Sequence, residues 1–342
     1  MYVRLLAEGA FARGRAPILL LGPGAVGSEE FSTHLGELES RVRIITFDGL
    51  SVRGLLLALE NETWSLPVVF ADGDPWLPRF ITSPPIRGGV TALVMRADGQ
   101  ASRGVVRAAQ TEAKSLLRQS VRLLRRYEIF TLTGATNRHP SRRQIPDPGT
   151  MIASASDGAE VRASWDRATP RAPRYWVGVV GAIGPRKNVD IVADAIASTG
   201  GEIGLIIAGQ NEVDETTIDA WLQPLTRQGN PIVRVSGTLD EYEFDAIIQG
   251  LDCVLVAHSN EGPSGILAKA VLAGTKVVAA GAQSLKRDAE NSEGMVIWSA
   301  LDAKAIARNL VEFLPIPSPS SPSAEAGKEI FCDRLLSNKK RK

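Results

Sequence analysis

Two adjacent cations follow a glycine turn in the second half of the chain. An apolar run at residues 177–180 predicts a buried strand, and it leads into Gly181-Ala182-Ile183-Gly184-Pro185-Arg186-Lys187-Asn188. Arg186 and Lys187 could neutralise phosphate oxygens, and the N-terminus of the helix expected next would add partial positive charge. These residue types predict a diphosphate site at the carboxyl end of the strand, with Gly181 in its turn.

Two further strand ends carry glycines. The apolar run Ile203–Gly209 ends in a glycine loop, so Gly209 is a second candidate for the site. Residues 252–257 predict another strand, followed by Glu261-Gly262-Pro263-Ser264-Gly265 and then a helical segment that carries Lys269. Taken alone, Glu261 could be no more than a favourable charge at a helix N-terminus.

The order of these motifs resembles the group 1 (family 4) retaining glycosyltransferases, which have the GT-B fold. The resemblance runs from Trp176 to about Ala280, close to a third of the chain. It implies a nucleoside-diphosphate sugar as donor substrate, no other cofactor, no metal, and a site in the C-terminal half. Glu261 matches an acid that contacts the donor sugar. The expected donor-binding residues are Gly181, Arg186, Lys187, Gly209, Gly262, Ser264, Gly265 and Lys269.

Two departures from the family pattern bear on activity. Lys269 stands where the family usually has a second acid that binds ribose, and Ala182 stands where an arginine often follows the first glycine. A subset of such enzymes carries a Ser-Gly-x-Leu-x-Lys-Ala form, so Lys269 does not exclude catalysis. A catalytically degenerate binding protein with a GT-B-like fold stays open as an alternative.

A glycine loop near the N-terminus supports a different activity. Residues 22–27 (Gly-Pro-Gly-Ala-Val-Gly) fit G-x-G-x-x-G after a strand, and Asp48 follows at about the spacing of a ribose-binding acid. This pattern predicts an NAD-dependent oxidoreductase. Pro23 weakens it, because proline removes a backbone donor from a loop that should bind phosphate. The loop could instead be a tight turn, or Gly24 could face an interdomain cleft and the donor.

The acceptor side of the site is expected in the N-terminal half. Asp72-Gly73-Asp74 follows an apolar run at the carboxyl end of a predicted strand, and we select Asp74 as a catalytic candidate acting on an acceptor hydroxyl. Solvated acids in a turn are the alternative. A basic helix expected from Ser102 to Tyr127 could touch anionic lipid or a lipid-linked acceptor, or could simply be a solvated cationic face. The acceptor is expected to be a glycan, a lipid-linked molecule or a small molecule.

Alternating strands and helices predict two Rossmann-like, doubly wound domains facing a cleft. The expected boundaries are an acceptor-side domain at 1–150, a linker at 151–174, a nucleotide-sugar domain at 175–314, and a Pro/Ser connector with a short helix and basic tail at 315–342. A net charge of +1 gives no global field for nucleic acid. The two cysteines have no metal or redox spacing, the three histidines are too dispersed for a metal triad, and no apolar run is long enough for a membrane span. We therefore expect a cytoplasmic, metal-independent enzyme, with contact at the inner membrane face left open.

Overall fold

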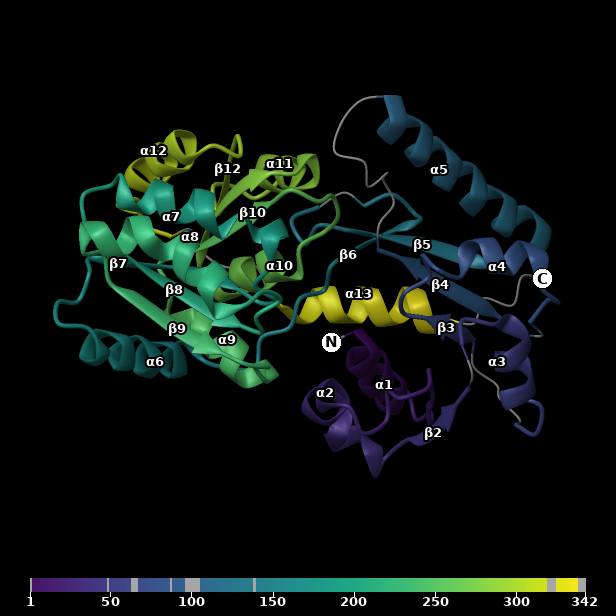
Figure 1. The fold of residues 1–342 in the computed structure, drawn as a ribbon. Helices are drawn as coiled ribbons and strands as arrows, with labels where there is room; N and C mark the ends of the chain where they lie inside the picture. The colour runs from purple at the N-terminus through teal and green to yellow at the C-terminus, as the bar shows by residue number, and fades with distance from the viewer. Residues whose placement is uncertain are drawn as a thin grey trace. The chain divides into compact units, whose positions relative to one another are not determined.

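The computed structural model describes residues 2–47, 49–62, 67–86, 88–95, 105–137, 140–318 and 324–337. These residues form two compact units, and most of their elements are labelled in Figure 1. Unit 1 contains the described residues of Met1–Thr133, His139–Pro148 and Glu325–Lys342. Unit 2 contains those of Gly134–Arg138 and Gly149–Ala324.

Unit 1 holds a parallel four-stranded sheet and a separate parallel pair of strands. The sheet has the order β3-β4-β5-β6, and the pair is β1-β2. The strands are β1 (Ile18–Leu21), β2 (Arg43–Thr46), β3 (Val68–Phe70), β4 (Val90–Val94), β5 (Glu128–Thr133) and β6 (Gln144–Pro146). Five of them lie where apolar runs predict strands; β6 was not predicted.

Helices cover both faces of the four-stranded sheet because its central strand is apolar on both sides. Val94 of β4 packs with α3, α4 and α5 on one face, and Leu93 packs with α1 and α13 on the other. Helix α13 was expected as a short helix after a connector, and its Phe331 is fully buried in this second layer. The helices are α1 (Tyr2–Ala12), α2 (Glu29–Glu39), α3 (Val52–Ala58), α4 (Leu77–Thr82), α5 (Val105–Arg125) and α13 (Ala324–Leu336).

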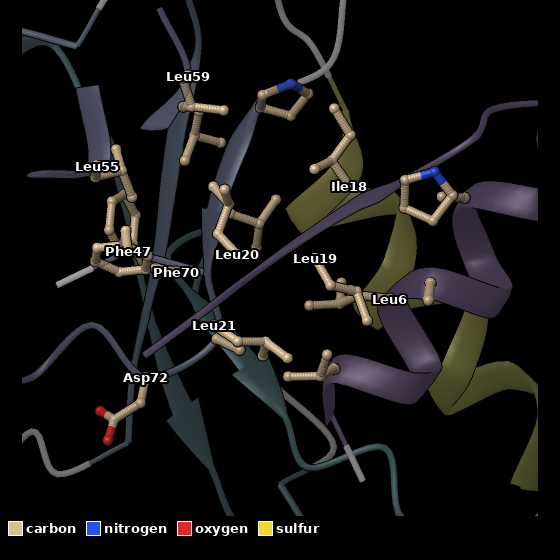
Figure 2. Close-up of a pocket in the computed structure, with 18 of the residues that line it drawn as sticks. Leu6, Ile18, Leu19, Leu20, Leu21, Phe47, Leu55, Leu59, Phe70 and Asp72 are labelled. Atoms are coloured by element: carbon tan, nitrogen blue, oxygen red, sulfur yellow. The ribbon is translucent and has the colours of Figure 1, made fainter. Parts of the chain in front are cut away.

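The strands β1 and β3 line a cavity of about 740 Å³ (Figure 2). In the described part of unit 1, β1 is hydrogen-bonded to β2 and β3 to β4, and the two strands are not paired with each other. The strands of this unit are therefore divided over two sheets, with apolar space between them.

Unit 2 is built on one parallel sheet of six strands. Its order is β12-β11-β10-β7-β8-β9. The chain first forms β7, β8 and β9 toward one edge of the sheet. It then returns to the centre and forms β10, β11 and β12 toward the other edge. This is the doubly wound order, with a switch point between β7 and β10. The strands are β7 (Tyr175–Val180), β8 (Ile203–Gly209), β9 (Ile232–Ser236), β10 (Cys253–His258), β11 (Lys276–Gly281) and β12 (Val296–Ser299).

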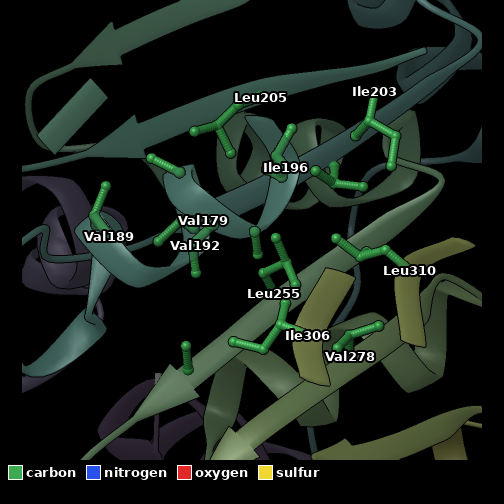
Figure 3. Packing of buried hydrophobic residues seen from close by; sticks show 14 of the residues in the cluster. Val179, Val189, Val192, Ile196, Ile203, Leu205, Leu255, Val278, Ile306 and Leu310 are labelled. Atoms are coloured by element: carbon green, nitrogen blue, oxygen red, sulfur yellow. The ribbon is translucent and has the colours of Figure 1, made fainter. Parts of the chain in front are cut away.

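Alternate residues of these strands fill two cores, as the period of two along a strand requires. Val179 and Leu255 face one layer with α7, α8 and α12 (Figure 3). Val180 and Val256 face the other, with α6, α9, α10 and α11. The helices are α6 (Ala155–Ala168), α7 (Val189–Ala197), α8 (Glu215–Gln228), α9 (Glu241–Gly250), α10 (Gly265–Ala273), α11 (Gln283–Glu290) and α12 (Ala303–Phe313).

Two segments differ from the sequence-based expectation. Residues 151–174, expected to be an irregular linker, contain α6, which Ser154 caps and whose Trp165 is buried against unit 2. Helix α5 was expected to bury Leu116 and Leu124, yet these side chains are 55% and 68% exposed, while Val121 is fully buried. Only a narrow stripe of α5 packs on α4 and the sheet, so part of its apolar side stays in solvent.

Candidate functional site

Several of the predicted donor-binding residues lie at or near the switch point of unit 2. Strand β7 passes to α7 on one face of the sheet, and its neighbour β10 passes to α10 on the other. The chain therefore diverges at the carboxyl ends of these two strands, which is where doubly wound sheets bind ligands. Gly181 follows β7, Gly209 ends β8, and Glu261 lies in the loop after β10.

Gly181 and Gly209 are in close backbone contact. Gly181 has φ +93° and Gly209 has φ +134°, conformations that residues with a side chain rarely adopt. A Cβ on Gly209 would collide with the Gly181 carbonyl oxygen. The two strand ends can therefore lie together only because both positions are glycine.

Lys187 is a buried cation beside this turn. Its side chain belongs to a short 3-10 turn (Pro185–Lys187), the residue is 2% exposed, and its Nζ donates to the Val180 carbonyl oxygen at 2.6 Å. Among the described residues, no carboxylate lies within ion-pair distance of this ammonium. Burial, assisted by the nearby Arg186 charge, lowers the Lys187 pKa to about 7. An anion bound here would form an ion pair with the Lys187 ammonium, whose charge its surroundings compensate poorly.

Arg186 faces outward next to Lys187. Its side chain is 43% exposed, and its Nε lies 4.0 Å from Glu212 Oε2. The turn that carries both cations is tied to β10, because Asn188 donates to the Ala257 carbonyl oxygen at 2.7 Å. Asn188 adopts φ +48°, which its short polar side chain tolerates.

His258 is a residue of this site that the sequence analysis missed. It ends β10 and is 8% exposed, and its buried Nε2 has no hydrogen-bond partner in the part of the chain that the structure describes. Burial and then the charges of Lys187 and Arg186 lower its pKa to about 3, so the ring is neutral. Its position just before the Glu-Gly segment was the only available signal, and a lone histidine carries little information.

Glu261 caps a helix in the described structure. Its carboxylate accepts the backbone N–H groups of Gln283 at 3.0 Å and Ser284 at 2.9 Å, at the start of α11. The Gly262 N–H donates to the Ser284 hydroxyl at 3.2 Å, and Ser264 caps α10 by accepting from the Leu267 N–H. The loop between β10 and α10 is thus fixed to the N-termini of two helices. Its contact with a donor sugar stays a prediction.

Lys269 has partners that differ from those expected of a nucleotide ligand. It is 7% exposed, and its Nζ donates to the Thr150 carbonyl oxygen at 2.7 Å and to Asp245 Oδ1, with Glu241 Oε1 3.5 Å away. Two acids from α9 therefore surround the ammonium. These contacts fix α9 and α10 to each other and to the segment before α6, and a ribose contact would have to compete with them.

The predicted residues of unit 1 are also held by local contacts. Asp74 Oδ2 accepts the Met95 N–H at 2.8 Å, and its Oδ1 lies 3.9 Å from Lys114 Nζ. Gly24, at φ +75°, sits in consecutive turns in which the Ala25 N–H donates to the Gly22 carbonyl oxygen. Asp48, the acid of the dinucleotide pattern, lies outside the described residues. The Ser28 hydroxyl caps α2 by accepting the Phe31 N–H, so this helix N-terminus is already closed by a side chain.

The basic helix has a mixed surface. Arg125 donates to the carbonyl oxygens of Phe80, Ile81 and Ser83, so this cation binds the end of α4. Leu123 is 80% exposed on the same helix. Residues 102–104 of the predicted helix lie outside the described part of the chain. No helix among the described residues is long and apolar enough to cross a membrane.

Comparisons with known proteins bear on the family and the fold of this chain. The family model described as "Glycosyl transferases group 1" matches residues 174–315. No curated protein sequence matches the chain. Sucrose-phosphate synthase from Thermosynechococcus elongatus is similar in structure with a TM-score of 0.60 and 16% identity, over 98% of this chain and 88% of that one.

Two further solved structures share the fold. HepE from Anabaena, in complex with UDP and glucose, has a TM-score of 0.51 and 15% identity, over 98% of this chain and 92% of that one. The α,α-trehalose-phosphate synthase (UDP-forming) from Burkholderia xenovorans has a TM-score of 0.51 and 12% identity, over 82% and 72%. Residues 174–315 therefore match the glycosyl transferases group 1 family model, and the chain has the GT-B fold predicted from its motifs.

Proposed function

We propose that this protein transfers a sugar from a nucleoside-diphosphate sugar to a hydroxyl group of a glycan or lipid-linked acceptor, with retention of configuration. The acceptor oxygen replaces the phosphate oxygen at the anomeric carbon, and the nucleoside diphosphate leaves. The observation that carries the proposal is Lys187, a buried ammonium at the switch point with no carboxylate within ion-pair distance among the described residues. A departing diphosphate would supply the missing negative charge.

The surrounding residues support a division of roles. Arg186 is exposed enough to reach a second phosphate oxygen, and the backbone amides near Gly262 and Gly265 lie at a helix start. Glu261 is proposed to contact the donor sugar, and Asp74 to accept the proton of the acceptor hydroxyl. Two cations beside the leaving group would make a divalent metal unnecessary, so transfer should persist in EDTA. HepE in complex with UDP and glucose is a protein of the same fold with such ligands.

The decisive experiment combines binding and transfer. A thermal-shift screen against UDP-, GDP-, ADP- and dTDP-sugars should reveal one donor, because a ligand that binds only the native state raises the melting temperature. With that donor, Lys187→Met should abolish both the shift and the transfer to acceptor. Lys304→Met, which removes an exposed lysine of α12, is the matched control and should change neither. If Lys187→Met transferred the sugar at an unchanged rate, the assignment of the donor site to Lys187 would be wrong.

The competing functions predict different results. A degenerate binding protein would show the thermal shift without transfer or donor hydrolysis. An NAD-dependent oxidoreductase would bind NADH at the loop between Gly22 and Gly27. The structure gives the oxidoreductase function no support, because the Ala25 N–H of that loop and the Phe31 N–H at the start of α2 already have hydrogen-bond partners within the protein.

We further propose that the protein works in the cytoplasm against the inner face of a membrane. The exposed Leu116, Leu123 and Leu124 share α5 with several cations, a composition typical of helices that lie on anionic bilayers. Leu123→Ser with Leu124→Ser should reduce co-sedimentation with vesicles that contain phosphatidylglycerol. Leu57→Ser, at another exposed leucine of unit 1, is the control.

A further inference from the structure

The cavity of unit 1 takes no part in the site described above. It is bounded by β1 and β3, by α1 and α3, and by the residues that follow these elements. Its volume of about 740 Å³ is within the usual range for ligand pockets. The cavity is partly open to the outside, and apolar walls that stay in contact with water lose the free energy that burial would provide. An apolar space of this size therefore calls for an occupant.

The walls indicate the chemistry of that occupant. Aliphatic and aromatic side chains dominate, among them Leu6, Leu20, Phe47, Leu55, Phe70 and Trp76. Among the lining residues that the structure describes, only Arg15 and Asp72 carry a charge. A sugar or nucleotide would lose its hydration here without gaining enough hydrogen bonds, whereas a hydrocarbon chain would lose nothing.

The charged ends give the cavity a direction. Figure 2 shows Leu21 and Asp72 toward one end, and Ile18 and Leu59 toward the other. Asp72 lies two residues after the end of β3, and its Oδ1 accepts the Asp74 N–H at 3.2 Å. Asp72 thus lines the cavity beyond the carboxyl end of β3 and is hydrogen-bonded to Asp74, while Arg15 lines it before the amino end of β1.

We propose that this cavity binds the linear hydrocarbon chain of an amphipathic acceptor, whose hydroxyl-bearing head lies beside Asp72 and Asp74. The inference rests on the proposed sugar transfer and specifies its acceptor as a lipid rather than a glycan. The exposed leucines and cations of α5 belong to the same unit and suit a substrate taken from a bilayer. The competing explanation is that β1 closes onto β3 in solution and removes the space.

Quenching of Trp76 tests the proposal without any nucleotide sugar. Trp76 lines the cavity and is 7% exposed, so 10-bromodecan-1-ol bound there should quench its fluorescence with saturation. The quench should disappear in Trp76→Phe. Hexan-1-ol, octan-1-ol and decan-1-ol should displace the probe, and each added methylene should tighten binding about fourfold. Decan-1-ol should also have a higher kcat/KM as sugar acceptor than hexan-1-ol.

A matched pair of variants checks the location. Leu20→Phe places extra volume in the cavity and should weaken binding of the bromoalcohol about tenfold. Leu57→Phe makes the same change at a 61% exposed residue that does not line the cavity, and should leave binding unchanged. Circular dichroism and melting temperatures establish that both variants fold.

Three results would overturn the proposal. They are a quench that survives in Trp76→Phe, affinities that do not depend on chain length, and slow amide exchange showing that β1 and β3 are paired in solution. Failure of the sugar-transfer proposal is a separate result: the donor screen would be negative while the saturable quench persisted. In that case the cavity would remain a hydrocarbon site without an assigned reaction.

Discussion

A side chain on Gly209 would collide with the carbonyl oxygen of Gly181, so the ends of β8 and β7 approach as closely as backbones can. The turn that carries Arg186 and Lys187 begins only a few residues after this contact. The Gly181 N–H donates back to the Ala208 carbonyl oxygen at 2.8 Å, which fixes the same two strand ends from the other side.

Gly209→Ala should therefore be strongly destabilising. The variant suffers both the unfavourable φ of +134° and the steric overlap with Gly181. Gly237 offers a matched control, because its φ is +121° and a Cβ there would meet no atom within 4 Å. We expect Gly237→Ala to cost about 1–3 kcal/mol from backbone strain, and Gly209→Ala to cost about 1–3 kcal/mol more from overlap. Urea unfolding of both variants gives the difference, and equal losses would contradict the role of the contact.

Glu261 should contribute to stability and to transfer by separable routes. Glu261→Ala removes the acceptor of two α11 amides and should lower the free energy of unfolding by about 1–2 kcal/mol. Glu261→Gln keeps one oxygen and should lose less. If the carboxylate charge also acts on the donor, both variants should lose about a hundredfold in kcat. Glu290→Ala, at the other end of α11, is the control for both measurements. If kcat fell only in proportion to the loss of stability, Glu261 would have a structural role and no role in transfer.

Much of unit 2 could be predicted from local sequence. The strands that end at Val180 and His258 are continuous apolar runs, and the glycine turns after them mark the strand ends. Residues near in sequence decide these features, so the switch-point site was found without knowledge of packing. Alternating strands and helices favour a parallel sheet in which consecutive strands are neighbours, as they are within β7-β8-β9 and within β10-β11-β12.

Long-range packing decides what the sequence did not reveal. Phe331 of α13 and Leu6 of α1 share one core although they lie at opposite ends of the chain. The acids that surround Lys269 come from α9, and nothing in the spacing of residues connects the two helices. The space between β1 and β3 likewise depends on which strands pair. The exposed Leu124 shows that an apolar period alone overstates how much of a helix is covered.

Lys269→Met should destabilise unit 2 in a way that depends on pH. Asp245, whose side chain is fully buried, would lose its cationic partner, and such a loss costs about 3–5 kcal/mol. Burial already raises the Asp245 pKa above the usual 3.8, so the folded state holds its proton more tightly than the unfolded state. Stability therefore falls as pH rises from 3.8 through the raised pKa, and the deficit of the variant should shrink on acidification.

Urea unfolding of Lys269→Met at neutral and acidic pH checks this dependence. Lys269→Met combined with Asp245→Asn should recover part of the loss at neutral pH, because no buried charge is left unpaired. Lys304→Met is the surface control and should show no pH-dependent deficit. A deficit that is equal at both pH values would mean that lost packing, and not the charge of Asp245, causes the effect.

Donor binding should weaken as pH rises above the pKa of Lys187. In the free protein this pKa is about 7, far below its usual 10.5, because the ammonium is buried. A diphosphate needs the charged form, so binding above pH 7 requires proton uptake, and affinity should fall about tenfold per pH unit. The unfolded chain holds this proton up to pH 10.5, so the same group makes stability rise between pH 7 and 10.5. Calorimetric titration of the donor from pH 6 to 9 measures the first effect, and urea unfolding the second. Lys187→Met should abolish donor binding and remove the pH dependence of stability between pH 7 and 10.5. A pH-independent donor affinity in the unmodified protein would show that Lys187 does not bind the diphosphate.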